Sequence, residues 1–128
     1  MYVKDHKELI VWQKSMDLLV EVYHLVKKLP KEETYALSDQ MRRAAVSIPS
    51  NIAEGRGRSS ERDYIRFLFM ARGSRAELET QILACLRLNY FKETEAENAL
   101  NLVSEISSML NSMINKLSLK LKAQSSKL

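Results

Sequence analysis

The 128-residue chain contains only three glycines and two prolines, although these are the residues that most turns require. A β-sandwich or β-barrel of this length would need many more turn residues. Few turns imply few, long elements, so the composition favours an all-α protein. Hydrophobic residues make up 45% and charged residues 28% of the chain. This balance is typical of a single globular domain.

Cysteine and long apolar runs are also scarce. The one cysteine, Cys85, excludes an internal disulfide and a cysteine-cluster metal site, and we expect it to be a small buried residue. No apolar run approaches the roughly 18 residues of a membrane span. The first residues are charged, unlike those of a secretory leader. We therefore expect a cytoplasmic protein that does not associate with membranes.

Catalytic and metal-binding patterns are missing as well. Glu21 and His24 have the Glu-x-x-His spacing of di-iron bundles, but such a site needs a second pair and two further glutamates. The other histidine, His6, has Val3 instead of a glutamate three positions earlier. No histidine or cysteine lies close in sequence to Glu54 or Glu77, so these carboxylates have no obvious partner for acid–base catalysis. We expect no enzymatic activity, no metal and no cofactor.

Apolar residues at helical spacing predict four helices, over about 8–29, 33–55, 60–88 and 93–121. Residues 122–128 have no periodicity, and we expect this tail to fray. Long amphipathic helices joined by short loops predict one domain, an all-α, antiparallel, up-down-up-down four-helix bundle.

The first predicted helix has two apolar rows. One has unbroken heptad spacing and consists of Leu9, Trp12, Met16, Leu19, Tyr23 and Val26. The other consists of Leu18, Val22, Leu25 and Leu29. The heptad row predicts the main core seam, with Trp12 and Tyr23 as core anchors. The second row indicates that this helix contacts more than one neighbour.

The second predicted helix contains Pro49, which lacks an amide hydrogen and whose ring crowds the carbonyl of Ala45. The apolar stripe keeps its phase across the proline, which favours one helix kinked at this point. The alternative is that one helix ends near Ser47 and another begins with Ser50 as its cap.

Two features are notable in the third predicted helix. Ser60 and Asp63 have capping-box spacing, with Asp in place of Glu or Gln. Gly73 lies in the middle of this helix, where glycine costs roughly 1 kcal/mol relative to alanine. That cost suggests close approach to another backbone, at the level of Ala44 and Ser47.

Polar residues follow a stripe of their own on the second and third predicted helices, because their spacing of three and four residues places them on one face. We expect them to form a hydrogen-bond network between helices or between subunits, and a ligand pocket is the alternative. The predicted network consists of Gln40, Ser47, Asn51, Glu54, Ser74 and Glu77.

Arginines gather in the middle of the chain. Eight of them lie from Arg42 to Arg75, where only three residues carry a carboxylate. The net charge of this segment is therefore larger than the net charge of +4 of the whole chain. A Gly-Arg-Gly-Arg loop lets guanidinium groups approach phosphates closely. Aromatic residues among the arginines are few, which favours phosphate contacts with a double strand over base stacking. The predicted nucleic-acid-binding residues are Arg42, Arg43, Arg56, Arg58, Arg62 and Arg66.

The same arginines can serve a different role. They can form a solvated face with salt bridges to Glu54, Glu61 and Glu77, in this chain or in a neighbouring subunit, or they can bind an acidic protein. The alternative function is therefore a structural or protein-interaction module, such as a scaffold or an antitoxin-like partner, with no affinity for nucleic acid.

Three segments, beginning at Leu9, Gln40 and Arg66, resemble a four-helix-bundle family. The family is named for open reading frames in 23S ribosomal RNA intervening sequences. Ser-Ile-Pro-Ser-Asn-Ile-Ala-Glu-Gly at residues 47–55 is the most specific string. The resemblance covers the first three predicted helices, and the fourth matches only as an amphipathic helix.

This resemblance implies a ring, typically a homopentamer, with no established enzymatic activity. The family is similar to the accessory proteins of diversity-generating retroelements, which have a basic surface and bind nucleic acid together with a reverse transcriptase. The implied partners are therefore further copies of the chain, RNA or DNA, and a reverse transcriptase.

Overall fold

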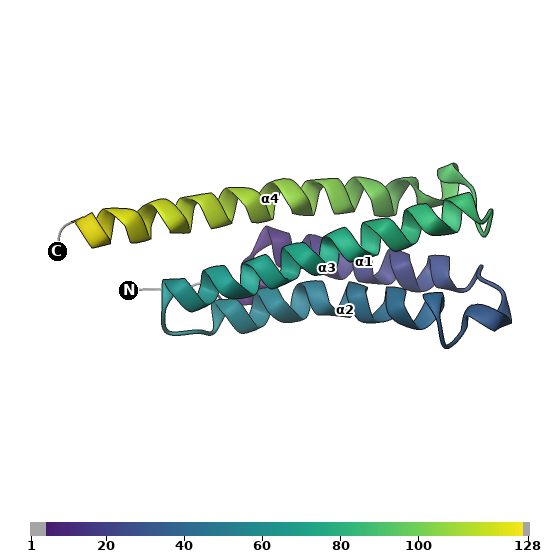
Figure 1. Cartoon of the computed structure of the whole chain (residues 1–128), viewed down its shortest axis with the longest axis horizontal. Helices are drawn as coiled ribbons and strands as arrows, with labels where there is room; N and C mark the ends of the chain where they lie inside the picture. The colour runs from purple at the N-terminus through teal and green to yellow at the C-terminus, as the bar shows by residue number, and fades with distance from the viewer. Residues whose placement is uncertain (1–4, 127–128) are drawn as a thin grey trace.

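The computed structural model describes residues 5–126, and its main elements are four long helices (Figure 1). They are α1 (Ile10–Val26), α2 (Leu37–Arg56), α3 (Glu61–Arg87) and α4 (Glu93–Ser126). Two 3-10 helices, η1 (His6–Glu8) and η2 (Lys31–Glu33), precede α1 and α2. No strand occurs within residues 5–126. The protein is an all-α four-helix bundle, as the sequence predicted.

The chain reverses direction at each connection between the long helices (Figure 1). The α2–α3 loop and the last turns of α4 therefore lie at one end of the bundle, which we call the loop end, while the α1–α2 and α3–α4 connections lie at the other. At 1.5 Å per residue, the 34 residues of α4 span about 51 Å and the 20 residues of α2 about 30 Å. The yellow end of α4 consequently projects past its neighbours in Figure 1.

All four long helices contribute fully buried apolar side chains to one core. Cys85 is among them, as expected of a lone cysteine, and its Sγ lies 3.6 Å from Sδ of Met41. The buried apolar residues of α2, α3 and α4 recur at helical spacing, as the periodicity of the sequence predicted. The largest fully buried side chains include Leu18, Met41, Ile48, Ile52, Leu68, Leu78, Ile82, Ile106 and Leu110.

The core face of α1 differs from the predicted heptad seam. Met16 and Tyr23 are 36% and 40% exposed, and Trp12 is only partly buried, so Tyr23 is not a core anchor. The reason is that α1 packs against both α2 and α4, and the residues that point between these two neighbours come mostly from the second row. The buried apolar residues of α1 are Val11, Leu18, Val22, Leu25 and Val26.

Helix α2 runs without interruption through Pro49, which is itself buried. The alternative of two separate helices is therefore wrong, and a bend at the proline stays a prediction. Before α2, α1 ends at Val26, earlier than the predicted end at 29, and Pro30 is extended with ψ of 159°. Leu29 lies outside the helix, as expected for the residue before a proline, which avoids the helical region.

The ends of α3 are fixed by local hydrogen bonds. Ser60 caps its start, because the Ser60 Oγ accepts a hydrogen bond of 3.1 Å from the Asp63 amide, as its capping-box spacing predicted. At the other end Asn89 has φ of 60°. The Tyr90 amide donates to the Cys85 carbonyl over 3.0 Å and the Asn89 amide to the Leu86 carbonyl over 3.1 Å. These two bonds form a Schellman motif.

Helix α4 is longer than its sequence periodicity indicated. It continues to Ser126, so the expected fraying is wrong for residues 122–126, while 127–128 lie outside the described residues. An ion pair of 2.7 Å between Lys120 and Glu61 ties these turns to the start of α3. Leu117, one turn earlier, packs against the core. Both contacts depend on tertiary structure and leave no periodic signal in the tail itself.

The close helix approach predicted at Gly73 occurs elsewhere. A Cβ at Gly73 would meet nothing within 4 Å, so that prediction is wrong. A Cβ at Gly55 would lie 2.7 Å from Cβ of Phe67 and 3.0 Å from Cδ1 of Tyr64. Gly55 is therefore a position at which α2 and α3 approach too closely to leave room for a Cβ, and it sets their spacing at the loop end. Within residues 5–126, no helix has the length and apolarity that a membrane crossing requires.

Candidate nucleic-acid interface

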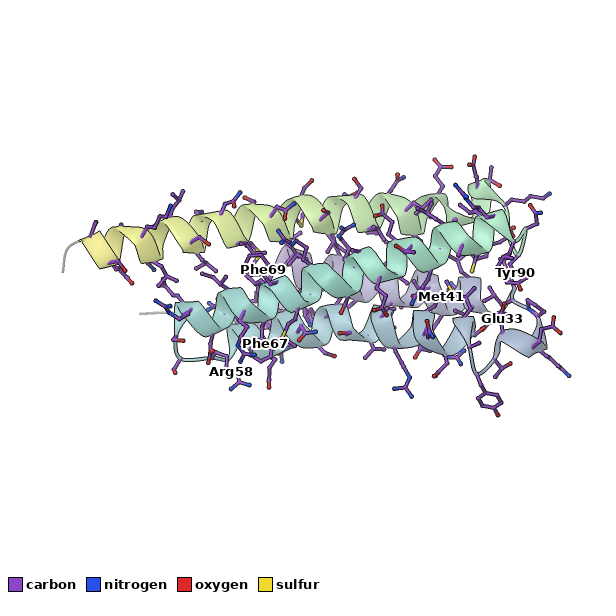
Figure 2. All side chains as sticks on the ribbon, viewed as in Figure 1. Glu33, Met41, Arg58, Phe67, Phe69 and Tyr90 are labelled. Atoms are coloured by element: carbon purple, nitrogen blue, oxygen red, sulfur yellow. The ribbon has the colours of Figure 1, made fainter. Side chains whose placement is uncertain are left out.

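Four of the six predicted arginines gather at the loop end. Arg56 ends α2, Arg58 lies in the loop, and Arg62 and Arg66 lie on the first turns of α3. The four-residue connection at 57–60 forces α2 and α3 to reverse sharply, which brings these positions together. Figure 2 shows Arg58 at this end, beside Phe67.

Aromatic rings support three of these guanidinium groups. Cζ of Arg58 lies 4.8 Å and Cζ of Arg66 lies 4.6 Å from the ring centroid of Phe67. Cζ of Arg56 lies 5.9 Å from the centroid of Tyr64, whose pKa is raised by burial. Cation–π contacts contribute about 0.5–2 kcal/mol each, so the rings hold the guanidinium groups in place at the surface.

Carboxylates neutralise some of these arginines and leave others free. Arg58 pairs with Glu54 at 3.0 Å and Arg66 with Asp63 at 3.5 Å. In the described part of the chain, Arg56 and Arg62 have no carboxylate partner within 4.0 Å. Exposed ion pairs contribute only about 0–1 kcal/mol, so a phosphate can compete for the paired arginines as well.

Arg42 and Arg43 are not part of this cluster. They lie in the first half of α2, and the 14 residues from Arg42 to Arg56 correspond to about 21 Å along the helix. Arg42 donates from Nη2 to the Thr34 carbonyl over 3.4 Å, and Arg43 pairs with Asp39 at 3.0 Å. The six predicted arginines therefore form two separate groups, of which only the loop-end group is concentrated.

Lysines of α4 join the arginines at the loop end. The last turns of α4 carry Lys116, Lys120 and Lys122, all exposed, and the pair between Lys120 and Glu61 places these turns against the start of α3. Lys122 was not predicted to take part, because it lies in the tail that was expected to fray, whereas Lys116 and Lys120 lie within the predicted helix. The spacing of Leu117 and Leu121 was the one available signal, since it continues the apolar row by one turn.

The predicted polar network is formed in part. Oγ of Ser47 and Oγ of Ser74 lie 2.8 Å apart and connect α2 to α3. Nδ2 of Asn51 donates to both the carbonyl and the Oγ of Ser47 over 2.9 Å. These three residues make one connected group between the two helices.

The other three residues of the predicted network lie apart from this group. Glu54 pairs with Arg58, Gln40 is exposed, and Glu77 accepts a hydrogen bond of 3.3 Å from the Gln81 side chain. Gln81 is buried, and its Oε1 has no hydrogen-bond partner. The contacts of Ser47, Asn51 and Ser74 are those of a helix-to-helix link, and Ser47 also lines a shallow pocket with Tyr23 and Arg43.

Residues 5–126 contain no cluster of three or more histidine, cysteine, aspartate or glutamate side chains that could hold a metal ion. Of the two residues with di-iron spacing, Glu21 is half-buried and His24 is exposed on the surface of α1.

Comparison with known proteins connects the chain to one family. Residues 7–112 match the family model described as 23S rRNA-intervening sequence protein. No curated protein matches the chain. The fold is similar to a crystal structure from Bacteroides thetaiotaomicron, described as a protein with unknown function from the S23 ribosomal protein family. The TM-score is 0.76 with 30% identity, covering 82% of this chain and 98% of the other. The sequence strings, the bundle and the matched span agree, and the chain belongs to the 23S rRNA-intervening sequence protein family.

Proposed function

We propose that the protein is a non-enzymatic, oligomeric four-helix bundle that binds double-stranded nucleic acid, alone or in a nucleoprotein, through the loop end. The observation that carries this proposal is the gathering of Arg56, Arg58, Arg62 and Arg66 around one short loop. Guanidinium groups bind phosphates through paired N–H donors. The aromatic supports position three of these groups before any ligand arrives.

Such an interface recognises the backbone of a duplex and not its sequence. Phosphate contacts position a protein on a duplex, whereas sequence is read from base edges in the grooves. The four-residue loop at 57–60 is too short to enter a groove deeply. We therefore expect similar affinity for duplexes of different sequence and a strong decrease in affinity with salt.

Oligomerisation would extend this surface. Apolar side chains are exposed on two different helices, Met16, Val20 and Tyr23 on α1 and Phe69 and Met70 on α3. A closed ring joins two different faces of each subunit, and two separate apolar patches meet that requirement. We propose a homo-oligomeric ring, and a pentamer by family resemblance. Light scattering gives the subunit number, and a monomer would remove this part of the proposal.

The binding test is a triple variant with a matched control. Arg56→Gln, Arg58→Gln and Arg62→Gln together should abolish most binding to an RNA duplex in a filter assay at two salt concentrations. The control carries Lys27→Gln, Lys31→Gln and Lys92→Gln, which remove the same charge at the opposite end of the bundle and should change affinity little. Far-UV circular dichroism should be unchanged in both variants. Equal affinity and equal salt dependence of the loop-end variant and the native protein would contradict the proposal.

The second candidate is a protein-interaction module without affinity for nucleic acid. The observation that favours it is that three of the six predicted arginines, Arg43, Arg58 and Arg66, already pair with carboxylates three or four residues away in the chain. The same filter assay distinguishes the two candidates, because the native protein would then retain no duplex at either salt concentration. If the nucleoprotein form is correct, a reverse transcriptase is the partner that the family resemblance suggests.

A further inference from the structure

An open groove of about 630 Å³ lies between the first turns of α3 and the last turns of α4. The groove was not predicted, because its α4 wall belongs partly to the segment that was expected to fray. The first turns of α3 and the last turns of α4, which line it, lie at the loop end (Figure 1). Its lining consists of Arg62, Ile65, Ser118, Leu121, Lys122, Ser125 and Ser126.

The two cations of the groove differ from Arg58, Arg66 and Lys120 in having no carboxylate partner. Arg58, Arg66 and Lys120 each form an ion pair. Arg62 and Lys122 form none with any residue from 5 to 126, and no carboxylate lines the groove. An uncompensated pair of cations facing one concavity attracts an anion.

The rest of the lining identifies the kind of anion. The Ser118 and Ser125 hydroxyls add hydrogen-bond donors, which suits the oxygens of a phosphate. The Ser126 hydroxyl donates to the Ala123 carbonyl over 3.0 Å. Ile65 and Leu121 add an apolar surface of the type that a sugar or another carbon skeleton can contact. A metal cation is a poor fit, because the lining offers two positive charges and no carboxylate. Cations, hydroxyls and a short apolar wall together match a phosphodiester within a nucleic-acid strand.

We propose that this groove binds a backbone phosphodiester of the nucleic acid and that α4 is therefore part of the interface. This inference rests on the proposed function, and it adds a second segment of the chain, about 60 residues away in the sequence, to the arginine loop. The bound strand would run from the loop arginines across the first turns of α3 to Lys122. Arg62 belongs both to the loop-end arginines and to the lining of the groove, so it would contact phosphates bound at either place.

A charge-matched pair of variants tests the proposal by the salt dependence of binding. Arg62→Gln with Lys122→Gln removes both groove cations, and Arg87→Gln with Lys92→Gln removes two exposed cations at the opposite end. Each phosphate contact contributes about 0.9 to the slope of log affinity against log salt on a DNA duplex. The groove variant should therefore lose about 1.8 from the slope, while the control keeps the native value. Equal slopes for the groove variant and the native protein, or equal losses in both variants, overturn the proposal.

A local readout distinguishes occupation of the groove from a general charge effect. Burial raises the pKa of the Cys85 thiol to about 11, and a neighbouring carboxylate adds to this effect. Cys85 should therefore react slowly with iodoacetamide. Ser125→Cys places a reactive thiol in the groove, and Ser104→Cys places one at an exposed position of the same helix away from it. The duplex should slow alkylation at position 125 severalfold and leave position 104 unchanged.

The outcomes separate this inference from the proposed function. If the Ser125→Cys protein binds the duplex and position 125 is not protected, the groove assignment is overturned and the arginine loop remains as the interface. Native protein that does not bind duplex at all overturns both. Protection of position 125 by polyglutamate and not by the duplex identifies an acidic protein as the occupant and also overturns the phosphodiester assignment.

Discussion

Replacing Gly55 with alanine tests the packing that forms the loop end. The new Cβ would lie 2.7 Å from Cβ of Phe67 and 3.0 Å from Cδ1 of Tyr64. Carbon atoms prefer about 3.5–4.0 Å, so the first contact must lengthen by nearly 1 Å. The Tyr64 ring can rotate, but Cβ of Phe67 is fixed to the α3 backbone and cannot. Relief therefore requires α2 and α3 to separate where the arginines are held.

The magnitude follows from two opposing effects. Overpacking of a close contact costs about 1–3 kcal/mol, and the fixed position of the Phe67 Cβ places this case near the upper value. Alanine recovers up to about 1 kcal/mol of helix propensity, because Gly55 has no positive φ that would strain it. The net loss is about 2 kcal/mol. For 128 residues with an unfolding entropy of about 2.1 cal/mol/K each, this lowers Tm by about 7 °C.

The assay is thermal unfolding followed by circular dichroism, with Gly73→Ala as the matched control. Gly73 also lies inside a helix, but a Cβ there meets nothing within 4 Å. The control should therefore raise Tm by about 4 °C through helix propensity alone. Opposite signs for the two glycines support the close approach of α2 and α3 at Gly55. An increase of Tm at both positions would refute it.

Three further predictions concern the opposite end and the core. The Tyr90 hydroxyl donates a 2.7 Å hydrogen bond to Oε2 of Glu33. This bond, together with desolvation and nearby negative charge, raises the Tyr90 pKa to about 12. The stability from this bond should be present below pH 10 and lost between pH 10 and 12, and Tyr90→Phe should remove the last step of the absorbance titration at 295 nm. Cys85, buried and with its pKa raised to about 11, should react with a thiol reagent only in denaturant, and rapid reaction of the native protein would contradict its burial. Asn89 has φ of 60°, so Asn89→Ala should destabilise the fold by about 1 kcal/mol while Asn89→Gly should not, as measured by urea unfolding.

Apolar periodicity was sufficient to predict the four helices and three of their core faces. It failed for α1, where two apolar rows compete and the heptad row containing Met16 and Tyr23 is the more regular one. Regular spacing reports which residues share a face, but not which face the neighbouring helices cover. The packing of α1 against both α2 and α4 decides that question, and it buries Leu18 and Val22 instead.

Part of the candidate site was predictable because it is local. Arg56, Arg58, Arg62 and Arg66 are joined by a loop that the glycine and serine residues at 55–60 mark clearly. Arg42 was predicted to bind nucleic acid with them because it lies near them in sequence. Sequence proximity overstates spatial proximity along a helix, since 14 residues correspond to about 21 Å, and the position of Arg42 follows from that length.

The α4 wall of the groove was not predictable for a different physical reason. Helices of marginal propensity are stabilised mainly by tertiary packing, and the last turns of α4 depend on contacts of Leu117 with the core and of Lys120 with Glu61. Neither contact is visible before the bundle is assembled. It follows that the Lys120–Glu61 pair has a consequence beyond its own small energy. By pairing with Glu61, Lys120 joins the last turns of α4 to the start of α3, and the same pairing brings Lys122 to the groove that Arg62 lines.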